Sequence, residues 1–423
     1  MVGDRTSPAR LLSSAEALCL ILRAGSLVTM GELPGARRGS AIARRIVHGF
    51  ALLMAALGLD AGARERTQAA PAAPAPASAE VAAPEPHPPT PRREESTWIA
   101  GGDVCFGREL GQRLLRDPAY DAFATVAPLL ASADVRFVNL ESQLSDQGGE
   151  TQSPRNLLVF TGPPAGADAL ARARVDVVAV ANNHMWDYGE KAFQETLLHL
   201  ERAGVAYAGA GYPRARAYAP VIVEREGFRV ALLAVTDIWN QGPLRLHPAR
   251  DVVADADPGE LVAAVRAARA DPTIDAVLVS YHGGDEYLEL PLTRARTMAR
   301  AAIDAGVDAF LGHHPHVLQG VEIRAGRPIF YSLGNFLFGV NIKHPETGLG
   351  MLARLRLRRG GAPGIEVCPF RILGLTAIPL AGDPRRAASE ALFAQRLRRV
   401  NAFLAGAPGL GPFGDDGCAP LGG

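Results

Sequence analysis

The sequence lacks several features that would narrow its function at once. It has no excess of charge, because Lys and Arg total 44 and Asp and Glu total 44 among 423 residues. This balance excludes a general attraction to nucleic acid or anionic lipid, so we expect no nucleic-acid partner and only local specificity for polyanions. The four cysteines form no CxxC pair, which gives no indication of a zinc ribbon, a thioredoxin-like site or a disulfide framework: Cys19, Cys105, Cys368 and Cys418.

The apolar run at residues 46–59, IVHGFALLMAALGL, is too short to span a membrane, which takes roughly 20 residues. It follows four arginines and precedes Ala61-Gly62-Ala63, as in a secretory signal. We predict cleavage after Ala63, with a retained N-terminal anchor as the alternative. The protein is then exported: periplasmic, in the cell envelope, secreted or membrane-tethered.

The run begins late in the chain, so translation is predicted to start near Met30, with a disordered leader after Met1 as the alternative. Residues 68–96 are rich in Pro and Ala and cannot offset their ordering entropy, which predicts a linker. The predicted parts are a leader and signal or anchor (1–63), a disordered linker (64–96), an α/β domain (97–340), late strands of the same domain (341–385) and a C-terminal helix with a Gly/Pro tail (386–423).

Strand-like and helix-like patterns alternate after the linker, which is typical of an α/β domain. The strands include a hairpin around Glu226-Gly227, and strands of both kinds predict two β-sheets face to face, flanked by helices. The predicted strands are 97–102, 136–141, 175–183, 221–235 (the hairpin), 275–284, 308–314, 329–338, 351–359 and 365–373, and the helices are 190–203, 258–270, 293–305 and 386–404.

Five of these strands end in groups that bind divalent cations. Carboxylates, an amide and imidazoles that open toward one sheet edge suit Mn, Fe or Zn, and a carboxylate between two ions would help to generate a hydroxide nucleophile. The groups are Asp103, Glu141, Asn183-His184, His282 and His313-His314-Pro315-His316.

Taken singly, most of these residues have ordinary structural explanations. Asp103 could brace a turn after two glycines, and Asn182-Asn183 could be a left-handed turn pair. His314-x-His316 after an apolar strand is a chelating arrangement and is harder to explain in that way. The joint pattern therefore favours a metal site.

Six ordered blocks resemble those of the CapA-type proteins, the capsule and poly-γ-glutamate biosynthesis family of the calcineurin-like metallophosphoesterase superfamily. The resemblance covers residues 97–340 and implies a calcineurin-like metallophosphoesterase sandwich. The blocks are GGDVCFGREL (101–110), FVNLES (137–142), ANNHMWDYG (181–189), SYHGGDEY (280–287), LGHHPHVLQG (311–320) and FYSLGNFLF (330–338).

The resemblance implies a role for each of seven residues. His184 is the catalytic residue that stabilises or protonates the leaving oxygen without binding metal. The ligands of one or two divalent ions are Asp103, the bridging Glu141, Asn183, His282, His314 and His316.

Two positions depart from the wider superfamily. Cys105 replaces the His of an Asp-x-His block, and the bridging carboxylate is Glu141 where Asp is usual. The first ion is then weakly held, absent or bound by a Cys105 thiolate. We favour a buried, inert Cys105 over a ligand.

Further residues in the blocks are candidates for supporting roles. Arg108 could clamp an anionic substrate, with surface solvation as the alternative. Glu286 and Asn335 could hydrogen-bond ligand imidazoles or substrate. For three further residues a structural role is as well supported as a functional one: His313, Asp187 and Tyr188.

Two functions are consistent with these residues. The first is a metal-dependent hydrolase that cleaves a phosphoester or an amide of an anionic polymer. Its substrate would be that polymer or a phosphorylated small molecule, and its partner a membrane-bound polymer synthesis complex. The second is a non-catalytic subunit that binds polymer or partners on the same fold. A periplasmic solute-binding protein gives no reason for the histidine pattern.

Overall fold

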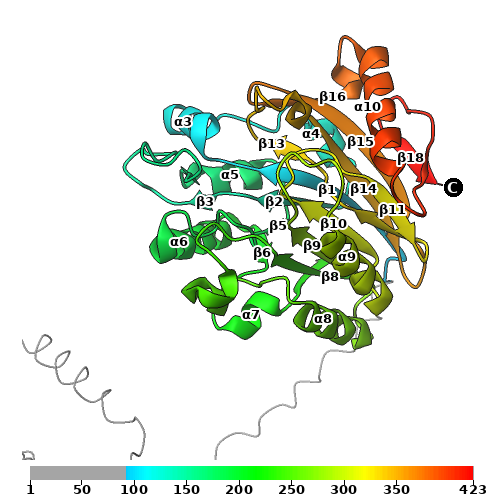
Figure 1. Ribbon diagram of the computed structural model, residues 1–423, viewed down its shortest axis with the longest axis horizontal. Coiled ribbons are helices and arrows are strands. Elements are labelled where there is room, and N and C mark those ends of the chain that lie inside the picture. The colour runs from blue at the N-terminus through cyan, green and yellow to red at the C-terminus, as the bar shows by residue number, and fades with distance from the viewer. Residues whose placement is uncertain (1–91, 423) are drawn as a thin grey trace, which may run out of the picture. The chain divides into compact units, whose positions relative to one another are not determined.

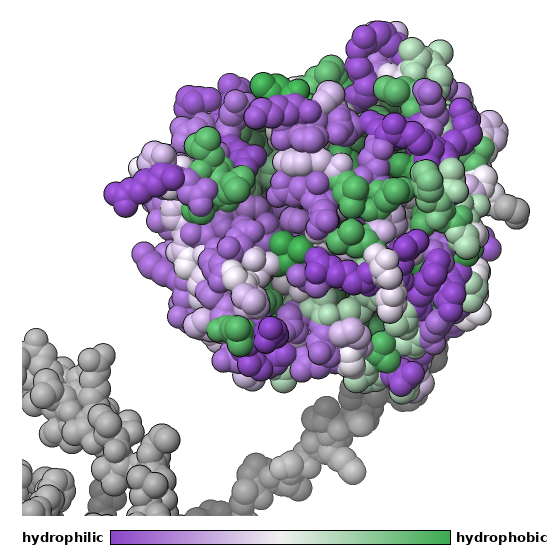
Figure 2. All heavy atoms as spheres, viewed as in Figure 1, coloured by the Kyte–Doolittle hydropathy of each residue, from purple (hydrophilic) through white to green (hydrophobic). Residues whose placement is uncertain are grey.

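The computed structural model describes residues 92–422 of the chain (Figure 1). The predicted leader, signal segment and most of the predicted linker lie outside these residues. Among the residues that the structure describes, no helix has the length and apolarity that crossing a membrane requires. Figure 2 shows hydrophilic side chains over much of one face of this domain, with apolar side chains in separate smaller groups.

Two sheets form the centre of the described domain. The larger sheet joins, in order, β17 (Gly409–Leu410), β18 (Ala419–Gly422), β15 (Gly364–Leu373), β14 (Leu349–Arg358), β1 (Glu95–Val104), β2 (Val135–Leu140), β5 (Val177–Ala179) and β6 (Ala206–Ala208), with β13 (Asn335–Leu337) beside β1 and β16 (Thr376–Pro379) beside β15. The second sheet joins β11 (Val321–Arg324), β12 (Arg327–Phe330), β10 (Ala309–His313), β9 (Ala276–His282), β8 (Phe228–Thr236) and β7 (Val221–Arg225). A short third pair joins β3 (Gln143–Leu144) and β4 (Thr161–Gly162).

Helices cover the sheets in Figure 1, with α8 and α9 beside the second sheet and α10 near β15 and β18. The α-helices are α3 (Arg108–Arg116), α4 (Ala127–Ala131), α5 (Ala165–Arg172), α6 (Gly189–Ala203), α7 (Arg214–Tyr218), α8 (Pro258–Ala270), α9 (Thr293–Ala305) and α10 (Arg386–Asn401). Short 3₁₀ turns are η1 (Leu244–Leu246), η2 (Pro248–Asp251), η3 (Pro345–Gly348) and η4 (Leu380–Gly382).

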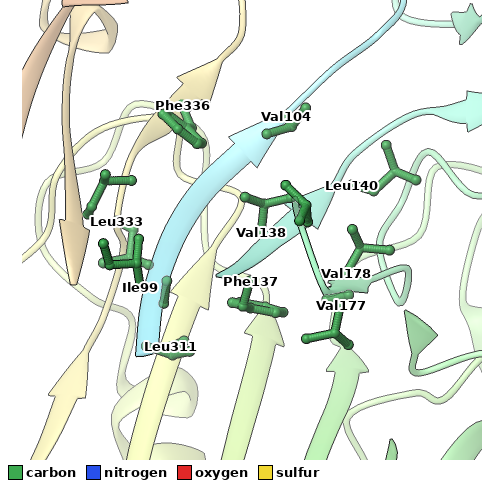
Figure 3. Packing of buried hydrophobic residues seen from close by; sticks show 14 of the residues in the cluster. Ile99, Val104, Phe137, Val138, Leu140, Val177, Val178, Leu311, Leu333 and Phe336 are labelled. Atoms are coloured by element: carbon green, nitrogen blue, oxygen red, sulfur yellow. The ribbon is translucent and has the colours of Figure 1, made fainter. Parts of the chain in front are cut away.

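The side chains of β8 alternate between two hydrophobic cores, which shows how the layers stack. Val230, Leu232 and Ala234 join the core between the two sheets, while Leu233 and Val235 join the core beneath α8 and α9. Successive side chains of a strand point to opposite faces, so an unbroken apolar run indicates a strand that is buried on both sides. Figure 3 shows buried residues of the core that includes Val230, with Phe137 of the larger sheet beside Leu311 of the second.

The fold class predicted from the sequence is confirmed, and so are the hairpin and the helices at 190–203, 258–270 and 293–305. Local chemistry explains the clear boundaries of these helices. The Asp257 side chain accepts a hydrogen bond from Glu260 N at the start of α8, and Pro258 is its first residue. Gly204 and Gly306 end α6 and α9 in the left-handed conformation that glycine adopts without strain.

Other predicted boundaries were wrong. Residues 329–338 form parts of two strands, β12 and β13, because the chain turns at Gly334, which has φ +72°. The predicted linker ends too late, since β1 begins at Glu95 and Arg92 pairs with Asp275 at 3.2 Å. The predicted Gly/Pro tail instead forms β17 and β18, and β18 pairs with β15.

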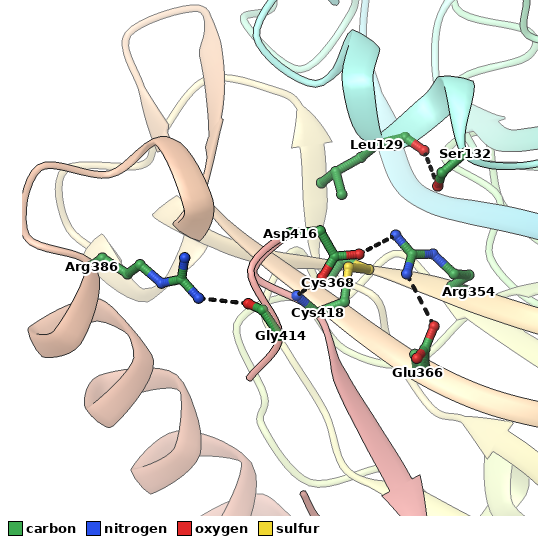
Figure 4. Close-up of a disulfide and its surroundings, with 9 residues drawn as sticks. All are labelled: Leu129, Ser132, Arg354, Glu366, Cys368, Arg386, Gly414, Asp416 and Cys418. Carbon is green, nitrogen blue, oxygen red and sulfur yellow. Dashed lines mark hydrogen bonds and ion pairs between the residues drawn. A yellow bond between two sulfur atoms is a disulfide. The ribbon is translucent and has the colours of Figure 1, made fainter. Parts of the chain in front are cut away.

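The cysteine spacing gave no indication of a disulfide framework, but the structure contains a disulfide. Cys368 of β15 and Cys418 form a disulfide across 50 residues of sequence (Figure 4). Asp416 accepts a hydrogen bond from Arg354 at 2.8 Å beside this bond. The spacing of the cysteines could not predict this disulfide, because the two residues come together only when β18 joins the sheet beside β15.

Removing this disulfide with Cys418→Ser is expected to lower the free energy of unfolding by about 2–5 kcal/mol, because the bond restricts the unfolded chain. Chemical denaturation of the oxidised full chain and of the variant measures the difference. Reduction of the wild type should reproduce the effect, whereas reduction of the variant should change nothing. Equal stability of all four samples would contradict the prediction.

Candidate metal centre

Parallel pairing brings the predicted ligands to one edge of each sheet. Asp103 lies opposite Asn139 in the register of β1 and β2, and Glu141 follows β2 directly. His282 and His313 are register partners at the ends of β9 and β10. Since carboxyl ends of parallel strands share an edge, side chains from distant parts of the sequence meet there.

Close packing fixes the backbone under Asp103. A Cβ atom on Gly102 would lie 1.8 Å from the carbonyl oxygen of Gly334, so only glycine permits this approach. The approach lets Asp103 N donate to Gly334 O at 3.1 Å. Gly102 therefore positions the carboxylate that follows it.

Glu141 lies at the centre of the site. It belongs to two buried groups whose ligand atoms are within 4.8 Å of one another: Glu141 with His282 and His314, and Glu141 with Asp103 and His316. Its Oε1 lies 3.5 Å from His282 Nε2 and 3.8 Å from His316 Nε2. A carboxylate shared by two ligand groups is the arrangement expected of a bridging ligand.

The surroundings of Glu141 fit a bound cation. Neither of its carboxylate oxygens has a hydrogen-bond partner among the described residues, and the side chain is fully buried. Burial, followed by the charges of Asp103 and Glu286, raises the pKa of Glu141 well above its ordinary value. An orphaned buried carboxylate is costly, and divalent cations would relieve that cost.

Asp103 has the opposite electrostatic environment. Burial by itself would raise its pKa, but His313 and His316 hold the pKa of Asp103 well below its ordinary value. Asn139 Nδ2 donates to its Oδ1 at 2.9 Å, and His314 N donates to its Oδ2 at 3.2 Å. The carboxylate is thus held ionised and oriented.

His313 contacts Asp103 differently. Its Nδ1 lies 3.2 Å from Asp103 Oδ1, yet neither ring nitrogen has a partner in hydrogen-bonding geometry. We interpret the contact as electrostatic, because the distance is short and the alignment poor. His313 therefore supports Asp103 beneath the ligand groups.

Asn183 faces His282 across the first ligand group. Asn183 Oδ1 lies 2.7 Å from His282 Nε2, and Asn183 Nδ2 donates to Asn240 Oδ1 at 3.0 Å. The amide oxygen is thereby turned toward the ligands and the amide nitrogen away from them. Burial and the charge of His314 lower the pKa of His282 well below its ordinary value, which keeps the ring neutral, as a ligand must be.

The closing histidine pair is held by unusual backbone geometry. His314 and His316 have φ values of +96° and +58°, which are strained for residues with a Cβ atom. Burial and the charge of His316 lower the pKa of His314 to about 3. Asn335 Oδ1 lies 2.9 Å from His316 Nδ1, which fixes the ring with Nε2 toward Glu141.

His184 stands beside the ligand groups. Its Nδ1 lies 2.8 Å from Asp187 Oδ2, and its Nε2 lies 3.9 Å from Glu141 Oε1. Phe160 stacks on the imidazole with ring centroids 4.1 Å apart. Asp187 thus fixes the tautomer that donates through Nδ1, so Nε2 is the nitrogen available for proton transfer.

Cys105 is buried and apart from both ligand groups. Burial raises the pKa of its thiol to about 12, and its Sγ accepts from Gly107 N at 3.3 Å. It packs with Phe160 and Phe338. These surroundings agree with an inert Cys105, which belongs to neither buried ligand group.

A cavity of about 950 Å³ opens onto this centre. Asn183, His184 and His316 line its inner part, together with Asn335. Arg108 and the exposed Glu286 also line it, but neither contacts a ligand residue by hydrogen bond among residues 92–422. Glu286 acts on Glu141 through its charge alone.

Several supporting residues were missed at the sequence level. Period-two alternation from Glu141 would have indicated Asn139 on the same face of β2, whereas Phe160 and Asn240 come from loops without a recognisable pattern. For Asp187 the sequence supported a structural and a functional role equally, and the structure makes it the partner of His184. Tyr188 donates its hydroxyl hydrogen to Glu150, and among the described residues it has no hydrogen bond to the proposed ligands.

Comparison with known proteins gives consistent matches. A family model described as bacterial capsule synthesis protein PGA_cap matches residues 97–340. The PGA biosynthesis protein CapA of Bacillus subtilis (strain 168) is 31% identical over 283 residues, which cover 67% of this chain and 73% of the relative. The capsule biosynthesis protein CapA of Bacillus anthracis is 31% identical over 284 residues, which cover 66% and 68%.

A likeness to solved structures is weaker. The sulfate thiohydrolase SoxB of Thermus thermophilus aligns with a TM-score of 0.38 at 17% identity, over 69% of this chain and 48% of that structure. The chain thus spans about half the length of that protein.

Proposed function

Because the chain belongs to the bacterial capsule synthesis protein family PGA_cap, we propose that it is an exported, metal-dependent hydrolase that serves surface-polymer assembly. Its substrate would be a phosphoester or an amide of an anionic polymer, encountered beside a membrane-bound synthesis complex. The observation that carries the proposal is Glu141, which two buried ligand groups share while no described residue donates a hydrogen bond to either of its oxygens.

The residues present would divide the work of hydrolysis. Asp103, Glu141, Asn183, His282, His314 and His316 would hold divalent ions of the Mn, Fe or Zn class. Such ions supply Lewis acidity and activate water near neutral pH. The protein would place the substrate in the cavity, against His184.

His184 would move the proton in this scheme. Its Nδ1–H donates to Asp187, so Nε2 can carry a proton to the leaving oxygen or nitrogen. Phe160 covers one face of the ring and limits its rotation. Such an oriented imidazole is typical of general acid catalysis.

Export is supported by the disulfide as well as by the basic and apolar N-terminal pattern. Disulfides persist mainly outside the reducing cytoplasm, and both Cys368 and Cys418 are buried where their bond joins the sheet. A cell-envelope location would also place the site beside the growing polymer.

A non-catalytic role is the second candidate, favoured by Cys105. The thiol stands where the resemblance places a histidine ligand, and Cys105 belongs to neither buried ligand group. A polymer-binding subunit would retain the cavity without needing turnover. Complementation of capsule assembly by a folded His184→Gln protein would favour this role.

Metal analysis and a substrate panel test the hydrolase directly. We expect the purified full chain to retain at least one transition-metal ion and to hydrolyse one of three substrate types: a phosphomonoester, a phosphodiester or a γ-glutamyl amide. Chelation should abolish turnover and metal should restore it. A metal-free protein that turns over none of them, yet supports capsule assembly in cells, would reject the proposal.

A further inference from the structure

Arg108 is held in place more rigidly than a solvated surface arginine. Its φ of +53° lies in the left-handed region, which costs an L-residue energy. Two hydrogen bonds with Thr151 secure this backbone: Arg108 N donates to Thr151 O at 2.9 Å, and Thr151 Oγ1 donates to Arg108 O at 2.9 Å. The strained conformation directs the start of α3 along the cavity wall.

The guanidinium is packed against aromatic rings. Its Cζ lies 4.5 Å from the centroid of Phe160 and 5.5 Å from that of Phe338. The same Phe160 ring stacks on His184, so one phenyl ring contacts both the arginine and the proposed proton donor. Arg108 is thereby fixed beside the reacting position.

The described part of the chain offers this cation no paired carboxylate. Within residues 92–422 its guanidinium pairs with no carboxylate, and its sole side-chain hydrogen bond is a long one, 3.4 Å to Leu157 O. Nε is buried without an acceptor. Native proteins rarely leave a half-buried guanidinium so poorly satisfied, and an oxyanion in the cavity would satisfy it.

We propose that Arg108 forms an oxyanion subsite next to the metal centre, which binds a carboxylate or phosphate group of the substrate other than the group that reacts. This deepens the proposed function, because it makes an anionic group next to the scissile bond a requirement for recognition. Arginine suits the task, since its planar donors match both kinds of oxyanion.

Calorimetric titration of the full chain in chelator, with inorganic phosphate and with glutarate as separate probes, tests the subsite. Wild type should bind at least one probe saturably. Arg108→Ala should weaken that binding about 10- to 100-fold, as loss of hydrogen bonds to a charged group predicts, and Arg108→Lys should weaken it several-fold. The preferred probe identifies the substrate's anionic group as phosphate or carboxylate.

Arg116→Ala is the matched control. Arg116 is exposed on the same helix, about 12 Å along its axis, and lines the outer cavity. The Arg116→Ala substitution removes the same charge as Arg108→Ala. If its affinity for the probe stays within about twofold of wild type, the loss in Arg108→Ala is due to a specific subsite and not to a general positive field. Equal losses in both variants, or no saturable binding by wild type, would overturn the inference. Neither metal nor turnover enters this measurement, so its failure leaves the hydrolase proposal standing.

Discussion

Glu141→Gln is expected to remove metal binding at both positions while leaving the protein folded. The Glu141 carboxylate belongs to both ligand groups, so the substitution takes a charged oxygen from each at once. Loss of an outer partner of a metal ligand already costs 10- to 100-fold in affinity, so loss of the shared ligand should cost roughly 100-fold or more. Elemental analysis and metal titration of the full chain measure the loss.

Thermal unfolding provides a second readout for this variant. Metal should raise the melting temperature of the wild type and leave that of Glu141→Gln unchanged, because only binding to the native state stabilises it. Without metal, the variant should be at least as stable as the wild type, since the buried Glu141 carboxylate has no hydrogen-bond donor within residues 92–422.

Glu286→Gln is the control for charge. Glu286 lines the same cavity and is exposed, and its charge acts on Glu141 without contact. It should keep nearly wild-type metal content. If Glu141→Gln also bound metal at wild-type affinity, the shared-ligand interpretation would be wrong.

His184→Gln should reduce turnover by about 10²–10⁴-fold, the usual contribution of a positioned general acid or base. Metal content and melting temperature should remain close to wild type, because His184 belongs to neither ligand group. The fall in turnover should be smaller for a substrate with a good leaving group, since its leaving oxygen needs less protonation. Steady-state kinetics on two substrates of different leaving-group pKa measure the contrast.

Two variants sharpen this prediction. Asp187→Asn should lower turnover by a smaller factor, since it perturbs the tautomer while keeping the imidazole. His199→Gln, on α6 outside the cavity, should have wild-type kinetics. Turnover by His184→Gln equal to that of wild type would show that the imidazole transfers no proton in the limiting step.

Much of the fold could be predicted because its signals are local. Apolar runs such as residues 275–284 indicate strands that are buried on both faces, and Asp257-Pro258 marks the start of a helix by capping chemistry alone. Strand β5 ends at Ala179 and is much shorter than predicted. Val180 N still donates to Ala208 O at 3.0 Å, and the backbone beyond it leaves the sheet and carries Asn183 and His184. Periodicity does not distinguish a strand from an extended loop that carries function.

The site was less fully predictable, because its supporting contacts join distant residues. Asn139 holds Asp103, Asn240 turns Asn183, and Phe160 stacks on His184, each through a neighbour set by packing. The Cys368–Cys418 disulfide is likewise a contact between residues far apart in the sequence. No spacing rule predicts such pairs, since only the assembled sheets determine the distances.

By itself, the sequence determined which candidate ligands follow which strands, since hydrophobic pattern and residue chemistry are local properties of the chain. The resemblance implied a bridging Glu141, but only the tertiary structure shows that two buried groups share it, that Cys105 belongs to neither group and that Arg108 has no carboxylate partner among residues 92–422. Those three facts depend on distances of a few ångströms between segments far apart in sequence. Packing of the two sheets sets these distances.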